Sequence, residues 1–455
     1  MARKITEVDA EWAWSPYEPN SEQPWNLARA AHLYRRAGFG ATSRQLQDAV
    51  KQDPADVVAT FLAPGNTSAF EEEMDSFGKT ILAARSAQSL SAWWLYRMIN
   101  TPDQTLEKAT LFWHGHFATS AEKVTDAKLM LQQNDLLRKY ARGNFEQLVH
   151  RISRDPAMLI YLDSTTNRKT HPNENYAREL MELFCLGLGN YSEKDIQEIA
   201  RCFTGWEVLR GNFRFNSFQH DEGTKSFLGQ SGKYGGEDAV RIVVSQNASA
   251  QFIVSKLIRF FVLDEPQPPM SLVEPLAQEL RDHEFHVGRV LKRIFNSQLF
   301  FSRYALSQKI RSPVELAVGL IRSLEVQTNL NRVSQLLEEL GQRPFYPPNV
   351  KGWDGGRTWI NSSTLLGRAN LVRQILTDDS SKFGGGDLES LTNRNGVKAP
   401  KDIVQWLLDA LLAVEVQDNV REQLTRLASE QQIATSKRIS NVIHAISTLP
   451  EFQLC

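Results

Sequence analysis

Apolar residues recur three and four positions apart along most of this chain, which is the spacing of one face of an α-helix. Residues 43–62 predict two amphipathic helices with a break before Pro54, because proline disfavours a helical conformation in the residue that precedes it. The same spacing predicts helices over residues 90–113, 122–140, 144–153, 172–188, 192–203, 250–263, 271–284, 288–297, 312–325 and 331–341, and again in the last 50 residues.

Three stretches depart from this pattern. Residues 204–250 contain alternating aromatic and polar residues at 213–219, followed by several glycines, and predict a short β-hairpin or an irregular excursion. Residues 343–360 are rich in Pro, Gly and Trp and predict an irregular packed loop. The run Gly384-Gly385-Gly386 indicates a linker or exposed loop over 379–400.

These elements predict a mainly α protein, a large single multi-helical domain with a small irregular or β-hairpin excursion and a C-terminal helical tail. We expect an N-terminal extension at 1–26, a main helical domain at 27–378, a linker or exposed loop at 379–400, and a C-terminal helical segment at 401–455 that packs on the main domain. No strand–helix alternation supports a parallel sheet.

Composition narrows the class of protein more than its function. Of 455 residues, 42% are hydrophobic, and 52 Lys+Arg against 53 Asp+Glu give a net charge of −1. This balance excludes a disordered chain and argues against bulk affinity for nucleic acid. The three cysteines imply no disulfide framework. No stretch resembles a secretory signal, and none has the about 18 apolar residues needed to span a bilayer. We therefore expect a cytoplasmic protein. Export of a chain from which a leader has been removed stays an open alternative.

The densest polar cluster is 161–182 (YLDSTTNRKTHPNENYARELME). On a helix, Glu174 and Arg178 lie four residues apart, while His171 adjoins them and Glu179 lies on the neighbouring face. One interpretation is a catalytic site in which Glu174 or Glu179 is the acid/base, His171 assists and Arg178 clamps an anion. The alternative is a surface salt bridge combined with helix capping.

Histidines form the second candidate cluster. His114 and His116 are two residues apart at a predicted helix end, and a His-x-His pair can bind a metal when a third ligand comes from elsewhere. His220, followed by Asp221 and Glu222, could supply that ligand, which would make the cofactor a divalent metal. Otherwise the pair packs against aromatic residues and His220 caps a turn.

The third cluster combines flat aromatic surface with polar donors. Trp353 and Trp359 lie near Arg357 and Asn361 in the sequence PPNVKGWDGGRTWIN, a mixture that suits a carbohydrate or another polyhydroxylated ligand. Asn173 and Asn175 are further candidates for binding such a substrate. A structural loop pinned by its tryptophans explains the same residues.

Several common catalytic motifs are absent from the sequence. It contains no Gly-x-Ser-x-Gly elbow, His-Glu-x-x-His motif, Walker A loop or dinucleotide-binding fingerprint. Classical serine-hydrolase, zincin, P-loop and Rossmann chemistry are therefore disfavoured.

At these clusters the sequence resembles a bacterial family, the domain of unknown function 1800. The matching stretches are HLYRRAGFGAT (32–42), LFWHGHFATS (111–120), RDPAMLIYLDSTTNRKTHPNENYARELMELFCLGLGNYSEKDI (154–196), FTGW (203–206), HDEGTKSFLG (220–229), KIRSPVEL (309–316) and PPNVKGWDGGRTWINSSTLLGRAN (347–370). The resemblance spans roughly residues 27–375, with no recognisable signature beyond about 380. It implies a single large helical domain and supplies no reaction.

Because all the clusters fall within these stretches, we expect one shared pocket. Its residues would be His114, His116, His171, Glu174, Arg178, Glu179 and His220. Three functions fit it: a hydrolase or lyase acting on a carbohydrate-like or other polar substrate, a metal-binding protein, and a non-catalytic helical binding or scaffold protein. The sequence leaves substrate and oligomeric state open.

Overall fold

Helices account for most of the computed structural model, which describes residues 5–63, 65–83 and 87–455. The first group is α1 (Ala10–Trp14), α2 (Leu27–Arg36), α3 (Ser43–Ala49), α4 (Pro54–Leu62), α5 (Ser68–Ala83), α6 (Ala87–Asn100) and α7 (Gln104–His116). The second is α8 (Ala127–Tyr140), α9 (Phe145–Ser153), α10 (Pro156–Tyr161), α11 (Asn175–Glu179), the π-helix η3 (Leu180–Cys185), α12 (Glu193–Cys202), α13 (Gly236–Val244), α14 (Asn247–Phe261), α15 (Met270–Asp282) and α16 (Val287–Phe295).

The third group is α17 (Pro313–Ser323), α18 (Leu330–Glu339), α19 (Ser362–Thr377), α20 (Leu388–Arg394), α21 (Pro400–Leu411), α22 (Asp418–Ala428), α23 (Thr435–Ser447) and α24 (Pro450–Gln453). Short 3₁₀ turns are η1 (Ile5–Glu7), η2 (Ser164–Thr166), η4 (Ser217–Gln219) and η5 (Gly356–Trp359). The prediction of a mainly α protein in a single domain is confirmed.

Local sequence signals set the helix boundaries. Thr42 and Gln45 form a capping box at the start of α3, and Ser312 and Glu315 form another at the start of α17. Pro54 occupies the first turn of α4, where its missing N–H removes no helical hydrogen bond, so the break predicted there is present.

The β structure consists of three small antiparallel pairs. Strands β1 (Trp206–Leu209) and β2 (Asn212–Phe215) form one hairpin, in which Trp206 pairs with Phe215. Strands β3 (Lys225–Phe227) and β4 (Gln230–Gly232) form a second, and β5 (Val326–Gln327) pairs with β6 (Lys382–Phe383). The first two confirm the hairpin excursion predicted between α12 and α13.

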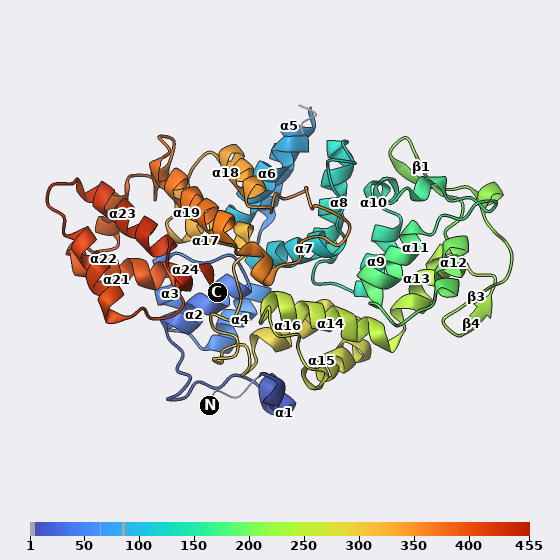
Figure 1. Cartoon of the computed structure of the whole chain (residues 1–455), viewed down its shortest axis with the longest axis horizontal. Helices are drawn as coiled ribbons and strands as arrows, with labels where there is room; N and C mark the ends of the chain where they lie inside the picture. Colours follow the sequence, from blue (N-terminus) through green and yellow to red (C-terminus); the bar gives the residue numbers. More distant parts are fainter. Residues whose placement is uncertain (1–4, 64, 84–86) are drawn as a thin grey trace.

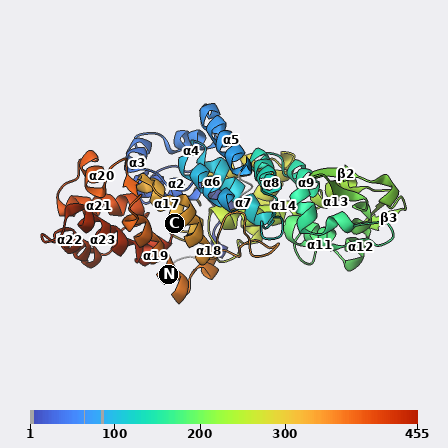
Figure 2. The same ribbon diagram turned by 90° about the horizontal axis from the view of Figure 1, so that it is seen from above.

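The molecule is elongated, with different helices at its two ends (Figure 1). At one end α11–α13 lie beside the two hairpins, and at the other lie α21–α23; the view from above shows the same order (Figure 2). Two hydrophobic cores follow this division. One is built mainly from residues between 5 and 305 and the other mainly from α6, α8 and the helices after residue 313.

Charged groups lie inside these cores as matched sets. The Glu107 carboxylate of α7 contacts the guanidinium groups of Arg97 and Arg138, and Glu315 of α17 contacts Lys108 and Lys309. Because a buried carboxylate is costly without partners, each set explains how such a charge is tolerated between helices.

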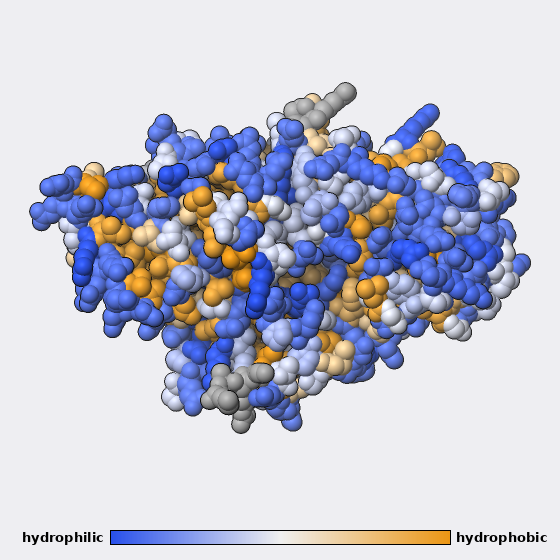
Figure 3. Space-filling view, in the orientation of Figure 1, coloured by the Kyte–Doolittle hydropathy of each residue, from blue (hydrophilic) through white to orange (hydrophobic). Residues whose placement is uncertain are grey.

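The C-terminal segment is tied to the rest of the chain by buried arginines. Arg35 donates to the carbonyl oxygen of Ala410 at 2.8 Å, and Arg311 donates to that of Leu411 at 3.0 Å. Arg368 Nε donates to Gln453 Oε1 at 2.7 Å. On the face shown in Figure 3, apolar side chains gather over the C-terminal helices.

The segment 379–400 differs from the linker or exposed loop that its glycines indicate. It contains β6 and α20, and Leu388 and Leu391 of α20 are buried in the second core. The sequence does not reveal α20, because the apolar residues on either side of the three consecutive glycines are too few to show a helical period.

All three cysteines are free and buried, as expected for Cys185 and Cys202. Cys185 is the last residue of η3 and Cys202 the last of α12. In the part of the chain that the structure describes, no helix combines the length and apolar character needed to cross a membrane.

Candidate functional site

His114, near the C-terminal end of α7, is buried and serves the packing of a loop. Its Nε2 accepts a hydrogen bond from the backbone N–H of Phe345 at 3.0 Å, and its ring packs against Trp94 and Trp353. Burial lowers the pKa of His114 to about 3, so the ring is neutral at physiological pH. Its accepting nitrogen is already occupied by the chain itself.

His116, at the end of the same helix, is also buried and has different partners. Its Nε2 lies 2.9 Å from the carbonyl oxygen of Phe184, and its Nδ1 lies 3.1 Å from Lys256 Nζ. A carbonyl only accepts, so Nε2 carries the proton and Nδ1 accepts from the lysine. Burial and the charge of Lys256 hold the pKa of His116 well below its usual range.

His220 lies away from this pair, beside the first hairpin. Its Nδ1 is 2.9 Å from the carbonyl oxygen of Thr204, and its ring packs against Phe215. The neighbouring Asp221 accepts from Arg201 Nε at 2.7 Å. The structure therefore does not bring the predicted metal ligands together. Within the described ranges no group of three or more His, Cys, Asp or Glu side chains is placed to hold a metal ion.

The asparagines of the His-Pro-Asn-Glu-Asn motif build a turn. Asn173 Nδ2 donates to the carbonyl oxygen of Asp163 and to Thr166 Oγ1, both at 3.2 Å. Asn173 Oδ1 accepts the backbone N–H of Asn175 at 3.0 Å. His171 is exposed on this turn, and its backbone N–H donates to Arg168. Asn173, predicted to bind substrate, is thus occupied in fixing the chain that leads into α11.

Glu174 and Arg178 form the expected salt bridge, at 3.2 Å, on the outside of α11. Arg178 also contacts Glu193 at 2.8 Å, and hydrogen bonding to Glu193 raises the pKa of the guanidinium. Ion pairs this exposed contribute little to stability, because water and salt compete for both partners. These two residues are a surface pair.

Glu179 and Glu182 have a different environment. Both are half-buried at the junction of α11 and η3. Burial raises the pKa of Glu179, and the charge of Glu182 raises it further, while Lys351 and Arg178 act in the opposite direction. Tyr191 donates from its hydroxyl to Glu182 Oε2 at 3.1 Å. Glu179 is therefore a partly accessible carboxyl whose proton is held more tightly than usual.

A π-helix is a rare element that recurs at functional sites; Glu182 lies in η3, and Glu179 immediately precedes it. The N–H of Leu186 donates to Met181, five residues earlier, at 2.8 Å. The last carbonyl groups of a helix lack partners within it. Here Leu183 accepts from Lys256 Nζ at 3.1 Å, and Phe184 accepts from His116. The end of η3 is thus joined to both α7 and α14.

The tryptophan loop is pinned to α7 and does not form a single binding platform. Trp353 is half-buried, donates from Nε1 to the carbonyl oxygen of Gly341 at 2.9 Å and lies against Gly115. Trp359 is buried, and Asn361 caps α19 by accepting from the N–H of Thr364. Arg357, exposed, pairs with Glu265 at 2.9 Å. Among the predicted substrate-binding residues of this loop, Trp353 alone remains a half-exposed aromatic surface.

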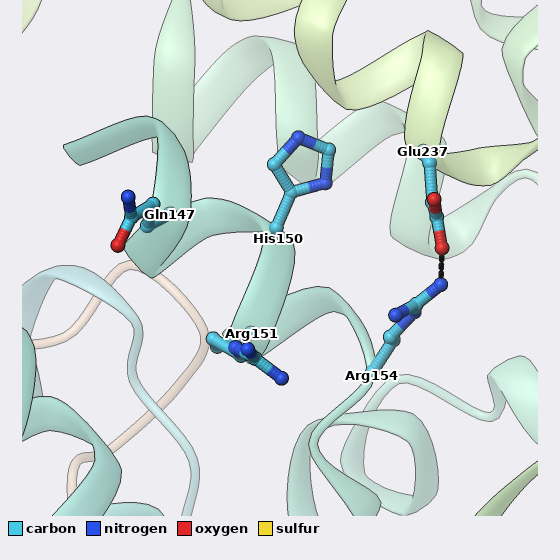
Figure 4. A pocket seen from close by; sticks show the side chains of 5 residues that line it. All are labelled: Gln147, His150, Arg151, Arg154 and Glu237. Atoms are coloured by element: carbon cyan, nitrogen blue, oxygen red, sulfur yellow. Dashed lines mark ion pairs between the residues drawn. The ribbon is translucent and has the colours of Figure 1, made fainter. Parts of the chain in front are cut away.

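Two cavities lie elsewhere. One has a volume of about 250 Å³ and is lined by Gln147, His150, Arg151, Arg154 and Glu237 (Figure 4). In it Arg154 is ion-paired with Glu237, and burial lowers the pKa of His150. The other, of about 260 Å³, is lined by Leu27, Ser43, Leu46, Gln47, Val397, Asp402, Gln405, Trp406, Asp409 and Ala410. None of the predicted site residues lines either cavity.

The residues of the expected shared pocket line neither of these cavities, and two of them interact with the tryptophan loop instead. His114 and Trp353 are in ring contact at 5.7 Å, and Glu179 lies within electrostatic reach of Lys351 on the same loop. Lys351 and Lys256 were absent from the sequence-based site. No local pattern marks them, because their relevance depends on the contact of segments far apart in the chain.

A family model described as "Protein of unknown function (DUF1800)" matches residues 32–454, nearly the whole chain. The chain belongs to the DUF1800 family. The match extends the family resemblance past residue 380, to the C-terminal helices where the sequence showed no signature. None of the curated proteins or solved structures compared with this DUF1800 chain matches it.

Proposed function

We propose that this DUF1800 chain is an acid–base enzyme, a hydrolase or lyase, that acts on a polar, carbohydrate-like substrate at Glu179 and Glu182. The observation that carries the proposal is the half-buried carboxyl pair at the start of η3, opposite Lys351. Paired carboxyl groups in different environments commonly serve as the acid and the base in such chemistry.

The two carboxyl groups differ in their surroundings. Burial and the neighbouring Glu182 raise the pKa of Glu179, which favours its protonated form and suits a general acid. Glu182 accepts a hydrogen bond from Tyr191, whose pKa is raised to about 12 by burial and by Glu182, so the phenol stays a donor. A carboxylate that accepts a hydrogen bond suits the base or the charge-stabilising role.

A polar substrate is supported by the neighbouring loop. Lys351 is exposed, and two residues further on Trp353 is held rigidly by its bond to Gly341 while part of its indole stays accessible. A partly accessible aromatic face in the same loop as an ammonium group that interacts with Glu179 can pack against a sugar ring while the polar groups orient its hydroxyls.

The test compares Glu179→Gln with the matched control Glu174→Gln on a panel of 4-nitrophenyl glycosides and esters. Glu174 lies on the same helix in an exposed ion pair, so its replacement should leave kcat within about twofold. Glu179→Gln should lower kcat by about 10²–10⁴-fold. Equal activity of the two variants would contradict the assignment.

Thermal stability separates a catalytic from a structural Glu179. Because the pKa of Glu179 is raised in the fold, its ionised form destabilises the protein above that pKa, and the penalty disappears as pH falls through it. Glu179→Gln should therefore keep or raise Tm at pH 8 and change it little at pH 4. A large drop in Tm at pH 8 would indicate a structural ion pair.

A non-catalytic binding or scaffold protein is the second candidate. The side chains of His114, His116 and Asn173 form hydrogen bonds to backbone groups of the chain itself. Motif residues with such partners stabilise the fold, and this favours the second candidate. It predicts that no compound in the panel is turned over and that Glu179→Gln lowers Tm.

A further inference from the structure

Lys256 of α14 places its amine between two acceptors at the end of η3. Its Nζ lies 3.1 Å from the carbonyl oxygen of Leu183 and 3.1 Å from Nδ1 of His116. The ring of Phe252, one turn earlier on α14, lies under the amine with its centroid 4.7 Å from Nζ. Both acceptors are uncharged, because His116 is neutral.

Burial, together with the charge of Arg259 on the same helix, lowers the pKa of Lys256 to about 8, while Cys185 acts in the opposite direction. His116, which contacts the amine, is uncharged and therefore does not stabilise the ammonium form through an ion pair. At pH 7 about a tenth of this amine is therefore unprotonated, whereas an ordinary lysine, with a pKa of about 10.4, is almost wholly an ammonium ion.

A comparison with Lys108 shows why this position is unusual. Lys108 is also buried, and its pKa is lowered to about 8, but its Nζ forms an ion pair with Glu315 at 2.5 Å and is completely enclosed. Lys256 is only half-buried and is held by neutral groups alone. Lys108 is thus part of a structural charge set, while the amine of Lys256, a partly exposed residue, has only neutral hydrogen-bond partners.

The geometry also directs the lone pair. A neutral amine has two N–H groups, and these match the two acceptors, Leu183 and His116. The lone pair then points away from both of them. Amines desolvated in apolar surroundings are the lysines that act as nucleophiles toward carbonyl compounds.

We propose that Lys256 is a reactive amine that forms an imine with an aldehyde or ketone. The Nζ lone pair forms a bond to the carbonyl carbon while the carbonyl electron pair moves to oxygen, which takes up a proton. Both protons of the neutral amine end on that oxygen, which leaves as water, and the product is a C=N bond to Nζ. His116 is a positioning residue, since it holds one N–H of the amine.

The experiment treats the full chain with glycolaldehyde and sodium cyanoborohydride, which reduces the imine to a stable secondary amine, and maps the adducts by peptide mass spectrometry. Exposed Lys382 is the internal control. Between pH 6 and 10, labelling of Lys256 should level off above a midpoint near 8, and at pH 7 it should be more than about tenfold faster than labelling of Lys382, since about a tenth of the Lys256 amine is neutral against less than about a thousandth of an ordinary lysine. Equal rates with no midpoint would overturn the proposal.

Two variants separate this site from its alternatives. Lys256→Arg keeps a donor for Leu183 and should abolish the adduct with little change in Tm, whereas His116→Gln should slow the labelling. If either variant fails to fold, the rates in the unmodified chain still decide. The inference is independent of the carboxyl pair, so Glu179→Gln should label Lys256 at the normal rate. Loss of labelling in that variant would show that the two sites are one.

Discussion

Glu107 is a fully buried carboxylate surrounded by donors. Arg97 Nε and Arg138 Nε each lie 2.6 Å from its Oε1, and Trp94 Nε1 donates to its Oε2 at 2.8 Å. Burial by itself raises the pKa of Glu107, but the charges of Arg138 and Arg97 outweigh it and lower the pKa to about 2. The group is therefore ionised in the fold, and two guanidinium groups depend on it.

We expect Glu107→Gln to lower the free energy of unfolding by about 3–5 kcal/mol, because it leaves two buried guanidinium groups without their carboxylate. Glu71→Gln is the matched control, since Glu71 contacts the same Arg97 but is 43% exposed, and it should cost less than about 1 kcal/mol. Urea unfolding at pH 7 measures both, and equal losses would contradict the role given to Glu107.

The effect of pH follows from the same group. Its pKa is lowered from 4.5 to about 2 on folding, so its stabilising contribution is complete above about pH 4.5 and is lost as pH falls toward 2. The difference between the unmodified chain and Glu107→Gln should therefore shrink between pH 5 and pH 2.5.

At the scale of elements, the end of α7 and the tryptophan loop meet through two glycines. Gly352 has φ of +76°, and a Cβ at this position would overlap the carbonyl oxygen of Gly115. Trp353 lies over Gly115, and His114 receives the N–H of Phe345 from the same loop. Two motifs more than 200 residues apart in the sequence are thus the two sides of one contact.

Gly352→Ala should cost about 1–2 kcal/mol for the left-handed backbone and about 1–3 kcal/mol more for the overlap with Gly115. Gly355→Ala is the control, because its φ is +77° and nothing lies within 4 Å of the added Cβ. That variant should show only the backbone cost. Thermal unfolding distinguishes them, and equal shifts in Tm would mean that the loop moves away from α7 without penalty.

The elements were more predictable than the site. Helices such as α3 and α4 follow from the spacing of their apolar residues and from Pro54, which are local signals. The π-helix η3 was expected as ordinary helix, because one residue inserted into the turn leaves the apolar pattern almost unchanged. The spacing of His114 and His116 could not show that each ring bonds to a different distant segment, at Phe345 and at Phe184.

At the scale of the whole molecule, the C-terminal helices share buried hydrogen bonds with the first and middle parts of the chain. Arg368 donates to Gln453 and, at 2.6 Å, to the carbonyl oxygen of Arg311, while Arg36 donates to the carbonyl oxygen of Cys455 at 2.9 Å. These contacts join the C-terminal residues to segments on the other side of the glycine run at 384–386. The glycines suggested a boundary between structural segments, but the hydrogen bonds cross it.

Calorimetry should accordingly show one unfolding transition whose calorimetric and van't Hoff enthalpies agree. Arg368→Ala should lower the Tm of that single transition, since each buried acceptor left without a donor costs about 1–3 kcal/mol. Arg357→Ala, at a side chain that is 83% exposed, should change Tm little. A separate early transition, shifted only by Arg368→Ala, would show that residues 401–455 unfold on their own.

The free cysteines provide a way to observe motion within this fold. Burial raises the pKa of Cys185, and it raises the pKa of Cys202 to about 12, so neither thiol reacts while its helix stays closed. A thiol reagent added to the native protein therefore reads the rate at which each helix opens. The modification rate of Cys185 reports on opening of the π-helix that contains Glu182, and that of Cys202 reports on opening of α12. The two thiols therefore measure local unfolding at two separate places in the chain.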